Sequence, residues 1–233
     1  MAAIRTPKEW WSTIGDWEAN AESVATPVCN AVMEKLLGVY ESIEARLPAT
    51  ASRLIAFIGT TPTDGTSTLA SAYANLLSTD LGKRVLLLRA RASFRESNVR
   101  LLHACEDVVH GRVALPDILH QVEKTQLYLG HVCADERSIS TLVMKPAFHG
   151  VTQELRNSFD YVIVDASTCS SSAEAVSLCA HADGAILVVE SEKTRWHVAD
   201  HLRADIAMRG GVVLGVVLNK VQRHLPNAIY RRL

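Results

Sequence analysis

A turn rich in glycine and threonine has the residue types of a phosphate-binding loop. Residues 59–68 read Gly-Thr-Thr-Pro-Thr-Asp-Gly-Thr-Ser-Thr. A working phosphate loop has the form G-x-x-x-x-G-K-[ST], in which backbone N–H groups surround the phosphates, the lysine reaches the outer phosphates and the hydroxyl holds Mg²⁺. Gly65 and Ser67 match this form, but Thr66 stands at the lysine position. The segment also fits an ordinary Pro/Asp/Gly turn that leads into a Ser/Thr helix cap. The candidate phosphate-binding residues are Gly65, Thr66, Ser67 and Thr68.

Three charged residues follow two apolar runs further along the chain. Arg89 and Arg91 come at the end of one run, and Asp165 ends another. In an open parallel sheet, ligands bind beyond the carboxyl ends of the strands, so these side chains are expected in front of residues 60–67. Two arrangements are open there. An arginine pairs with Asp165 in place of a bridging metal, or an arginine receives an anion.

The charge of the whole chain is balanced, with 24 Lys and Arg against 25 Asp and Glu. No global field draws such a chain to nucleic acid, and a nucleic-acid-binding role is not expected. Locally, residues 83–112 carry seven Lys/Arg against three Asp/Glu. This excess fits a basic patch for an acidic partner, an anionic polymer or a nucleotide phosphate, and it equally fits a set of solvated arginines around one ion pair.

Other sequence features exclude several classes of site. The five cysteines are widely spaced, and the nine histidines lack the i, i+4 pairing around a glutamate that a zinc hydrolase needs, so no metal site is expected. The serine-rich residues 167–172 lack a G-x-S-x-G elbow and are interpreted as a flexible loop. No stretch reaches about 18 uninterrupted apolar residues, which predicts a cytoplasmic protein that does not itself span a membrane.

Short apolar runs alternate with helical segments from residue 53 onward, as in a parallel sheet with crossover helices. The pattern predicts an α/β fold with a mostly parallel central sheet and helices on both faces, in three layers. The expected strands are 54–58, 85–88, 161–164, 185–189 and 212–218, with 127–132 weaker. The expected helices are 67–80, 116–122, 146–157, 173–181 and 194–209.

Residues 1–50 differ in composition and are interpreted as an N-terminal helical extension of a domain that covers residues 51–233. They contain three of the four tryptophans and four Lys/Arg against seven Asp/Glu. Trp10, Trp11 and Trp17 fall on one face of a predicted helix that either packs on its own domain, binds a partner helix or lies at a membrane surface. A second helix is expected over residues 27–46, ended by Pro48.

Four segments, taken in order, resemble a known family. They are residues 54–77, residues 81–88 (Leu-Gly-Lys-Arg-Val-Leu-Leu-Leu), residues 159–165 (Phe-Asp-Tyr-Val-Ile-Val-Asp) and residues 182–189 (Ala-Asp-Gly-Ala-Ile-Leu-Val-Val). This series is similar to the cytoplasmic tyrosine kinase domains of bacterial capsule and exopolysaccharide synthesis, which belong to the Min/Par group of deviant P-loop ATPases. The similarity continues to residue 221 and implies a P-loop NTPase-like fold.

The chain departs from that family at the residues that bind phosphate and metal. The resemblance implies a lysine at position 66, a glycine at position 63 and an Asp-x-Asp pair at positions 89–91, where this chain has Thr66, Thr63 and Arg89-Ala90-Arg91. Of the implied phosphate and metal groups, Ser67 and Asp165 remain. The family's C-terminal tyrosine cluster is reduced to Tyr230, and its oligomerisation helix is unrecognisable in residues 28–47.

The leading hypothesis is therefore a catalytically inactive, tyrosine-kinase-like regulatory or scaffold protein of exopolysaccharide synthesis or export. By resemblance, its partner is a membrane protein of that pathway, which would bring it to the inner membrane; homo-oligomer formation stays open. No cofactor is expected, although binding of ATP or ADP stays open. The alternatives are a weakly active kinase or ATPase, whose missing lysine is supplied by Arg89, Arg91 or a second subunit, and a Min/Par-type positioning protein.

Overall fold

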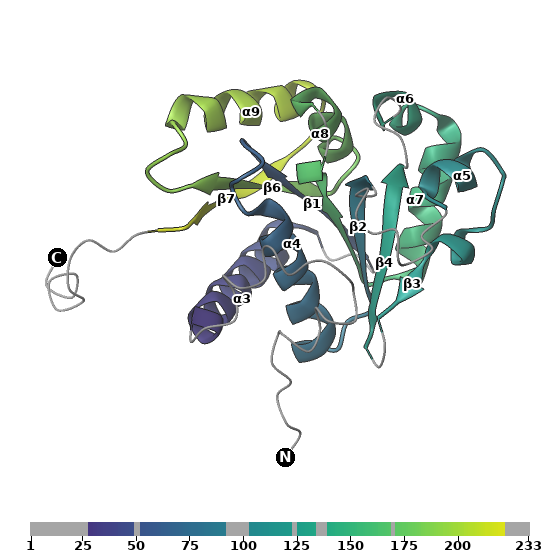
Figure 1. Ribbon diagram of the computed structural model, residues 1–233, viewed down its shortest axis with the longest axis horizontal. Coiled ribbons are helices and arrows are strands. Elements are labelled where there is room, and N and C mark those ends of the chain that lie inside the picture. Colours follow the sequence, from purple (N-terminus) through teal and green to yellow (C-terminus); the bar gives the residue numbers. More distant parts are fainter. Residues whose placement is uncertain are drawn as a thin grey trace, which may run out of the picture.

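The computed structural model describes residues 28–48, 52–91, 103–122, 125–133, 139–168 and 171–221. Seven strands of this part of the chain form one sheet in the order β3-β4-β2-β5-β1-β6-β7 (Figure 1). Every neighbouring pair is parallel except β3 and β4, which are antiparallel. The strands are β1 (Arg53–Gly59), β2 (Val85–Arg91), β3 (His120–Gln121), β4 (Leu127–Cys133), β5 (Tyr161–Asp165), β6 (Gly184–Glu190) and β7 (Val213–Asn219).

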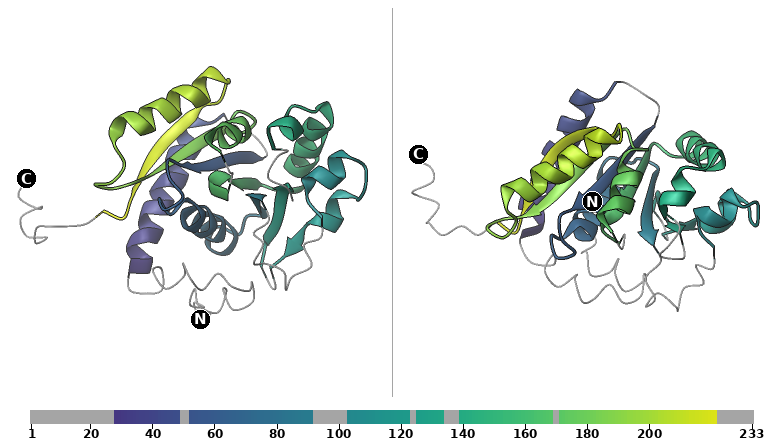
Figure 2. Two further views of the ribbon diagram at one scale, coloured as in Figure 1. Left: turned by 45° about the horizontal axis from the view of Figure 1, so that its top comes forward. Right: turned by 90° about the horizontal axis from the view of Figure 1, so that it is seen from above.

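Helices cover both faces of the sheet, which gives the three layers that the sequence predicts (Figures 1 and 2). The helices are α3 (Val28–Arg46), α4 (Thr66–Asn75), α5 (Cys105–Val109), α6 (Ile139–Val143), α7 (Pro146–Ser158), α8 (Ser172–Cys179) and α9 (Trp196–Met208). Helices α3 and α4 contribute to the core on one face, and α5 to α9 contribute to the core on the other. A π-helical turn, Leu76–Asp80, continues α4.

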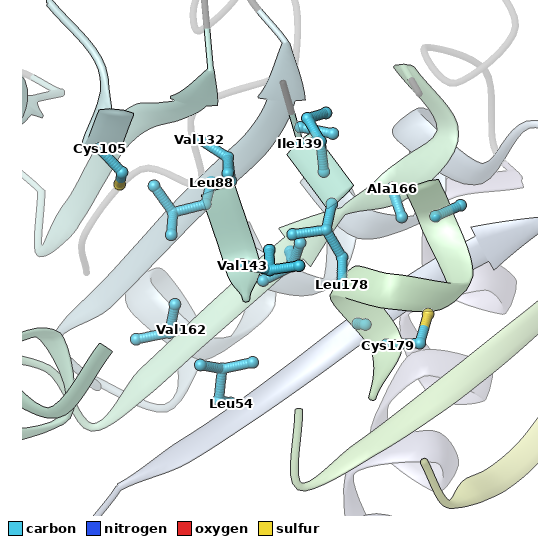
Figure 3. Close-up of a cluster of buried hydrophobic side chains, with 14 of the residues drawn as sticks. Leu54, Leu88, Cys105, Val132, Ile139, Val143, Val162, Ala166, Leu178 and Cys179 are labelled. Carbon is cyan, nitrogen blue, oxygen red and sulfur yellow. The ribbon is translucent and has the colours of Figure 1, made fainter. Parts of the chain in front are cut away.

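Alternating side chains of each central strand enter the two cores. In β1, Leu54, Ala56 and Ile58 face α5 to α9, whereas Ile55 and Phe57 face α3 and α4. Figure 3 shows the first core, where strand and helix side chains meet; the labelled ones include Leu54, Leu88, Val162, Ile139, Val143 and Leu178. Burial on both sides explains why these strands appear in the sequence as nearly continuous apolar runs.

The expectation of a helix over residues 116–122 is wrong. The segment forms a 3₁₀ turn, Leu115–Ile118, followed by β3, which pairs with the edge of β4. Pro116 fits the first turn of either helix type, but the open N–H and C=O groups of β4 offer His120 and Gln121 ladder partners that local propensity does not reveal. Helices α5 and α6 were not expected, because five residues are too short to show a helical period.

The expected helix before the first strand is confirmed as α3, which packs on the sheet. Leu36 and Ile43 are buried in the same core as α4. Glu44 accepts a hydrogen bond from the Tyr161 hydroxyl at 2.6 Å and forms an ion pair with Arg53 at 3.2 Å. The Trp10/Trp11/Trp17 stripe and Tyr230 lie outside the described residues. The described helices include none that is long and apolar enough to cross a bilayer.

Candidate functional site

The glycine- and threonine-rich loop connects β1 to α4 at the carboxyl edge of the sheet, as the sequence predicts. Both of its glycines are required by close packing. A Cβ on Gly59 would lie 2.4 Å from Thr66 Oγ1, and Gly65 has a φ of 81° in the left-handed region. A Cβ on Gly65 would also lie 2.4 Å from Asn219 Nδ2. The backbone of the loop is therefore folded tightly against its own side chains and against the end of β7.

Asp64 is the buried centre of the loop, with no exposed surface. Its Oδ2 accepts hydrogen bonds from the N–H groups of Thr60 and Thr61, each at 2.7 Å, and from the Thr60 hydroxyl at 2.6 Å. Its Oδ1 accepts the Thr61 hydroxyl at 2.6 Å. Burial raises the pKa of Asp64, but the hydrogen bonds from Thr60 and Thr61 outweigh that effect and hold the pKa below its ordinary value. Sequence reasoning assigned Asp64 to an ordinary turn and did not single it out.

Two lysines approach the outer side of the loop. Lys220 Nζ donates to the carbonyl oxygen of Thr63, and Lys193 Nζ donates to the Thr63 hydroxyl at 3.2 Å. Both ammonium groups lie near one oxygen of Glu190, at 3.1 Å for Lys193 and 3.4 Å for Lys220. These hydrogen bonds, and one of 2.8 Å from Asn219 Nδ2 to the carbonyl oxygen of Asp64, fasten the loop to the ends of β6 and β7. Lys193 and Glu190 were missed, because nothing in the sequence links them to the loop.

Ser67 and Asp165, the two residues that match the expected phosphate and metal groups, are joined through a third residue. The hydroxyls of Ser67 and Ser167 are 2.6 Å apart, and the Ser167 hydroxyl donates to Asp165 Oδ1 at 2.6 Å. The Ser167 N–H also donates to Oδ1 at 3.1 Å. Asp165 is only 1% exposed, and its Oδ2 has no hydrogen-bond partner among the described residues. The structure places Ser167 in a 3₁₀ turn, Ala166–Thr168, rather than in the flexible loop expected from the sequence.

The expected ion pair between Asp165 and Arg89 is not formed within the described part of the chain. Arg89 lies directly opposite Asp165 in the register of β2 and β5, as expected for residues at the carboxyl ends of neighbouring parallel strands. The Asp165 carboxylate instead accepts hydrogen bonds from the hydroxyl and N–H of Ser167, two residues further along the chain. A local donor of this kind is favoured over Arg89, because pairing with arginine would require a long side chain to be held in one conformation. The side chain of Arg91 is outside the described residues. The alternative, that an arginine receives an anion, stays a prediction.

The first turn of α4 presents backbone N–H groups at the loop. Thr66, Ser67 and Thr68 open the helix, and the first N–H groups of any α-helix lack intrahelical partners. The helix dipole adds a partial positive charge at this end. Thr66 is buried, and its hydroxyl has no hydrogen-bond partner among the described residues. The threonine keeps the helix start but supplies no positive charge.

The residues present do not fit a Mg²⁺ site of the kinase type. Mg²⁺ prefers octahedral oxygen coordination, usually through carboxylates, waters and substrate phosphates. Here Asp165 supplies one carboxylate, the Ser167 hydroxyl bridges it to Ser67, and β2 ends in arginines where the family pattern has acids. No group of three or more His, Cys, Asp or Glu side chains in the described part of the chain is arranged to hold a metal ion.

Known proteins with related sequences include a succinoglycan biosynthesis transport protein and a tyrosine-protein kinase. No family model matches the chain. The chain is 28% identical over 183 residues to the succinoglycan biosynthesis transport protein ExoP of Rhizobium meliloti (strain 1021), an alignment that covers 75% of this chain and 23% of ExoP. It is 21% identical over 175 residues to the tyrosine-protein kinase CpsD of Streptococcus agalactiae, covering 73% of this chain and 76% of CpsD. The chain thus corresponds to less than a quarter of the length of ExoP.

Solved structures of the same fold include a bacterial kinase domain. The kinase domain of Escherichia coli tyrosine kinase ETK superposes with a TM-score of 0.68 at 16% identity, covering 83% of this chain and 79% of that domain. The MinC:MinD cell division protein complex of Aquifex aeolicus gives a TM-score of 0.55 at 24% identity, covering 73% of this chain and 70% of that chain. Fold and loop position together define an α/β protein of the P-loop NTPase type. Within this class, the chain is similar in sequence to ExoP and CpsD and in fold to the kinase domain of ETK.

Proposed function

We propose that this chain is a catalytically inactive relative of those kinases and acts as a regulatory or scaffold protein of exopolysaccharide synthesis or export. The observation that carries the proposal is the replacement of charges around the loop. Thr66 stands where a phosphate loop has lysine, and Arg89 and Arg91 stand where the family has the acids that support Mg²⁺. Thr66 opens α4, and Arg89 and Arg91 lie at the carboxyl end of β2.

The size of the expected effect argues against residual turnover. Phosphoryl transfer depends almost entirely on positioning and on neutralising the developing charge. Removing a single preorganised donor commonly costs about 10²–10³ in rate. Loss of the lysine together with both acids should remove several such factors. The hydrogen bonds that join Ser67, Ser167 and Asp165 also argue against turnover, because these residues bond to one another rather than being positioned for a metal or a phosphate.

The pathway and the partner are inferred from the relatives. ExoP is named as a succinoglycan biosynthesis transport protein and CpsD as a tyrosine-protein kinase. By analogy, this chain acts in the cytoplasm and binds a membrane-associated component of polysaccharide synthesis or export. It reaches the inner membrane through that partner, with or without forming a homo-oligomer. It needs no cofactor for this role, and ATP or ADP are the ligands to test first.

The decisive experiment combines binding with catalysis. Calorimetric titration with ATP and ADP, with and without Mg²⁺, should show no binding that depends on the metal. Phosphate release and autophosphorylation should stay at background, and Thr66→Lys alone should not restore them, since the metal-supporting acids are still absent. Turnover above background that disappears in Ser67→Ala or Asp165→Asn would refute the proposal. In the source organism, Ser67→Ala should leave polymer production unchanged, whereas deletion of the gene should alter it.

A second candidate, a weakly active ATPase or kinase, is favoured by the two lysines on the loop. Lys193 and Lys220 already contact Thr63, so either ammonium group could supply the charge that Thr66 lacks. If so, phosphate release is measurable in the wild type and falls in Lys193→Ala or Lys220→Ala. Lys145→Ala is the matched control, because Lys145 contacts His110, a residue outside the loop. Background turnover in all four proteins would exclude this candidate.

A further inference from the structure

We propose that Asp64 is a built-in anion that fixes the shape of the loop, so that the loop keeps its conformation without bound phosphate or nucleotide. Loops of this class arrange backbone N–H groups around a ligand's negative charge. Here a carboxylate of the protein itself provides the negative charge at the start of the loop. The inference rests on the proposed function and deepens it, because a scaffold without a nucleotide cycle needs a binding surface of constant shape.

Both oxygens of the Asp64 carboxylate accept hydrogen bonds from within the loop. Four donors, all from Thr60 and Thr61, reach its two oxygens at 2.6–2.7 Å. A buried carboxylate is costly unless it is hydrogen-bonded, and this one has no exposed surface. Thr60 and Thr61 contribute both their backbone and their hydroxyl groups, so the two residues between β1 and Pro62 wrap around the acid. No charged side chain takes part in these four contacts.

The same residue ties the loop to the rest of the sheet. The carbonyl oxygen of Asp64 accepts the Asn219 side-chain amide at 2.8 Å, at the end of β7. The Thr60 hydroxyl lies 3.3 Å from the Thr194 hydroxyl, just before α9. Asp64 therefore connects the loop directly to the end of β7, and Thr60, one of its donors, connects the loop to Thr194. A loop held in this way from inside and outside has no need of a ligand to order it.

The charge of Asp64 persists at neutral pH. Burial by itself would raise its pKa, but the hydrogen bonds from Thr60 and Thr61 lower the pKa below the ordinary value. The charged groups nearest to Asp64 are Lys193, Lys220 and Glu190, which contact the neighbouring residue Thr63 from the ends of β6 and β7. Protonation removes one acceptor position and should loosen the contacts to the N–H groups of Thr60 and Thr61. The amide protection of these two residues should accordingly fall in acid.

Site-resolved amide hydrogen exchange on the full chain tests the inference. In the wild type, the Thr60 and Thr61 amides should be protected without ligand, and millimolar inorganic phosphate or ATP with Mg²⁺ should leave their exchange rates unchanged within about twofold. Asp64→Ala should raise both rates about tenfold or more, and Asp64→Asn should raise them less. Thr60→Val and Thr61→Val, which keep the backbone donors, provide milder variants if Asp64→Ala does not fold.

Asp117→Asn is the matched control, because Asp117 also accepts a backbone N–H, that of Ala114, in a turn outside the loop. It should leave the Thr60 and Thr61 amides unchanged. The wild type and Asp117→Asn, which both keep Asp64, should lose this protection as the pH falls through the folded pKa of Asp64, whereas Asp64→Asn should show no such dependence. Unchanged exchange in Asp64→Ala, Asp64→Asn and the two valine variants, or protection in the wild type that appears only with phosphate or ATP, would overturn the inference. Neither result bears on turnover, which the phosphate-release assay measures separately.

Discussion

Replacing Asp165 by asparagine separates a vestigial site from a working one. In a Mg²⁺-dependent enzyme, this carboxylate helps to hold the metal, and its loss weakens binding and activity. In the structure, Oδ1 is bonded to Ser167, while Oδ2 is buried without a hydrogen-bond partner among the described residues. If the site has no metal to bind, the charge is a cost to the folded state. We therefore expect Asp165→Asn to stabilise the protein.

The size of the expected stabilisation is estimated from Asp165 Oδ2, which has no hydrogen-bond partner among the described residues. Leaving a buried polar group without a partner costs about 1–3 kcal/mol, and more when the group is charged. Asparagine keeps an acceptor for Ser167 and removes the charge, but its amide N–H groups recover only part of the cost. A net gain of roughly 1 kcal/mol is expected, which corresponds to about 2–4 °C in Tm for a chain of this size.

Urea denaturation with and without Mg²⁺ provides the assay. The free energy of unfolding of the wild type should not change with Mg²⁺, and that of Asp165→Asn should be higher than the wild type in both buffers. Ser167→Ala should destabilise the wild type by about 1–3 kcal/mol and the Asp165→Asn background by less, because the lost partner is then neutral. Stabilisation of the wild type by Mg²⁺ that is absent in Asp165→Asn would refute this reasoning and the proposed loss of catalysis with it.

Three further predictions concern the stability of the fold. Gly59→Ala should cost about 1–3 kcal/mol in urea denaturation, because the added Cβ would lie 2.4 Å from Thr66 Oγ1. Asp183→Ala should cost about 1.5–3 kcal/mol in the same assay, because the part-buried Asp183 carboxylate accepts from the two terminal guanidinium nitrogens of Arg156 at 2.8 Å and from the N–H of Leu54 at 2.7 Å. Asp160→Ala, which removes one hydrogen bond from the N–H of Arg84, should cost less. Burial raises the pKa of Glu44, but hydrogen bonds from Arg53 and Tyr161 outweigh it and lower the pKa, so this residue stabilises the fold above its ordinary pKa and the contribution is lost as the pH falls through the folded value. Glu44→Gln should therefore flatten the acid limb of the thermal stability profile, and an unchanged limb would contradict the assignment.

Local patterns in the sequence were enough to predict the layers of the fold. Strands buried on both faces must be apolar throughout, and helices that pack by one face must repeat every three to four residues, so both leave a local signal. For the same reason, the strand, loop and helix of residues 53–75 were expected where they are found. The short antiparallel strand β3 was missed, because it depends on a partner strand rather than on its own residues.

The sequence by itself determined that Thr66, Arg89 and Arg91 stand at positions where the resembled kinases have lysine and acids, and the loss of charge at the site is a prediction from those residue types. Only the tertiary structure decided what the remaining groups do. Ser67 meets Ser167 across 100 residues, and Asn219 reaches Asp64 across 155, distances over which no local pattern acts. Asp64 is close in sequence to its donors, yet its burial depends on how the loop packs against the ends of β6 and β7. Hydrogen bonds between side chains depend on a few tenths of an ångström, and such precision is set by the packed fold rather than by residue type.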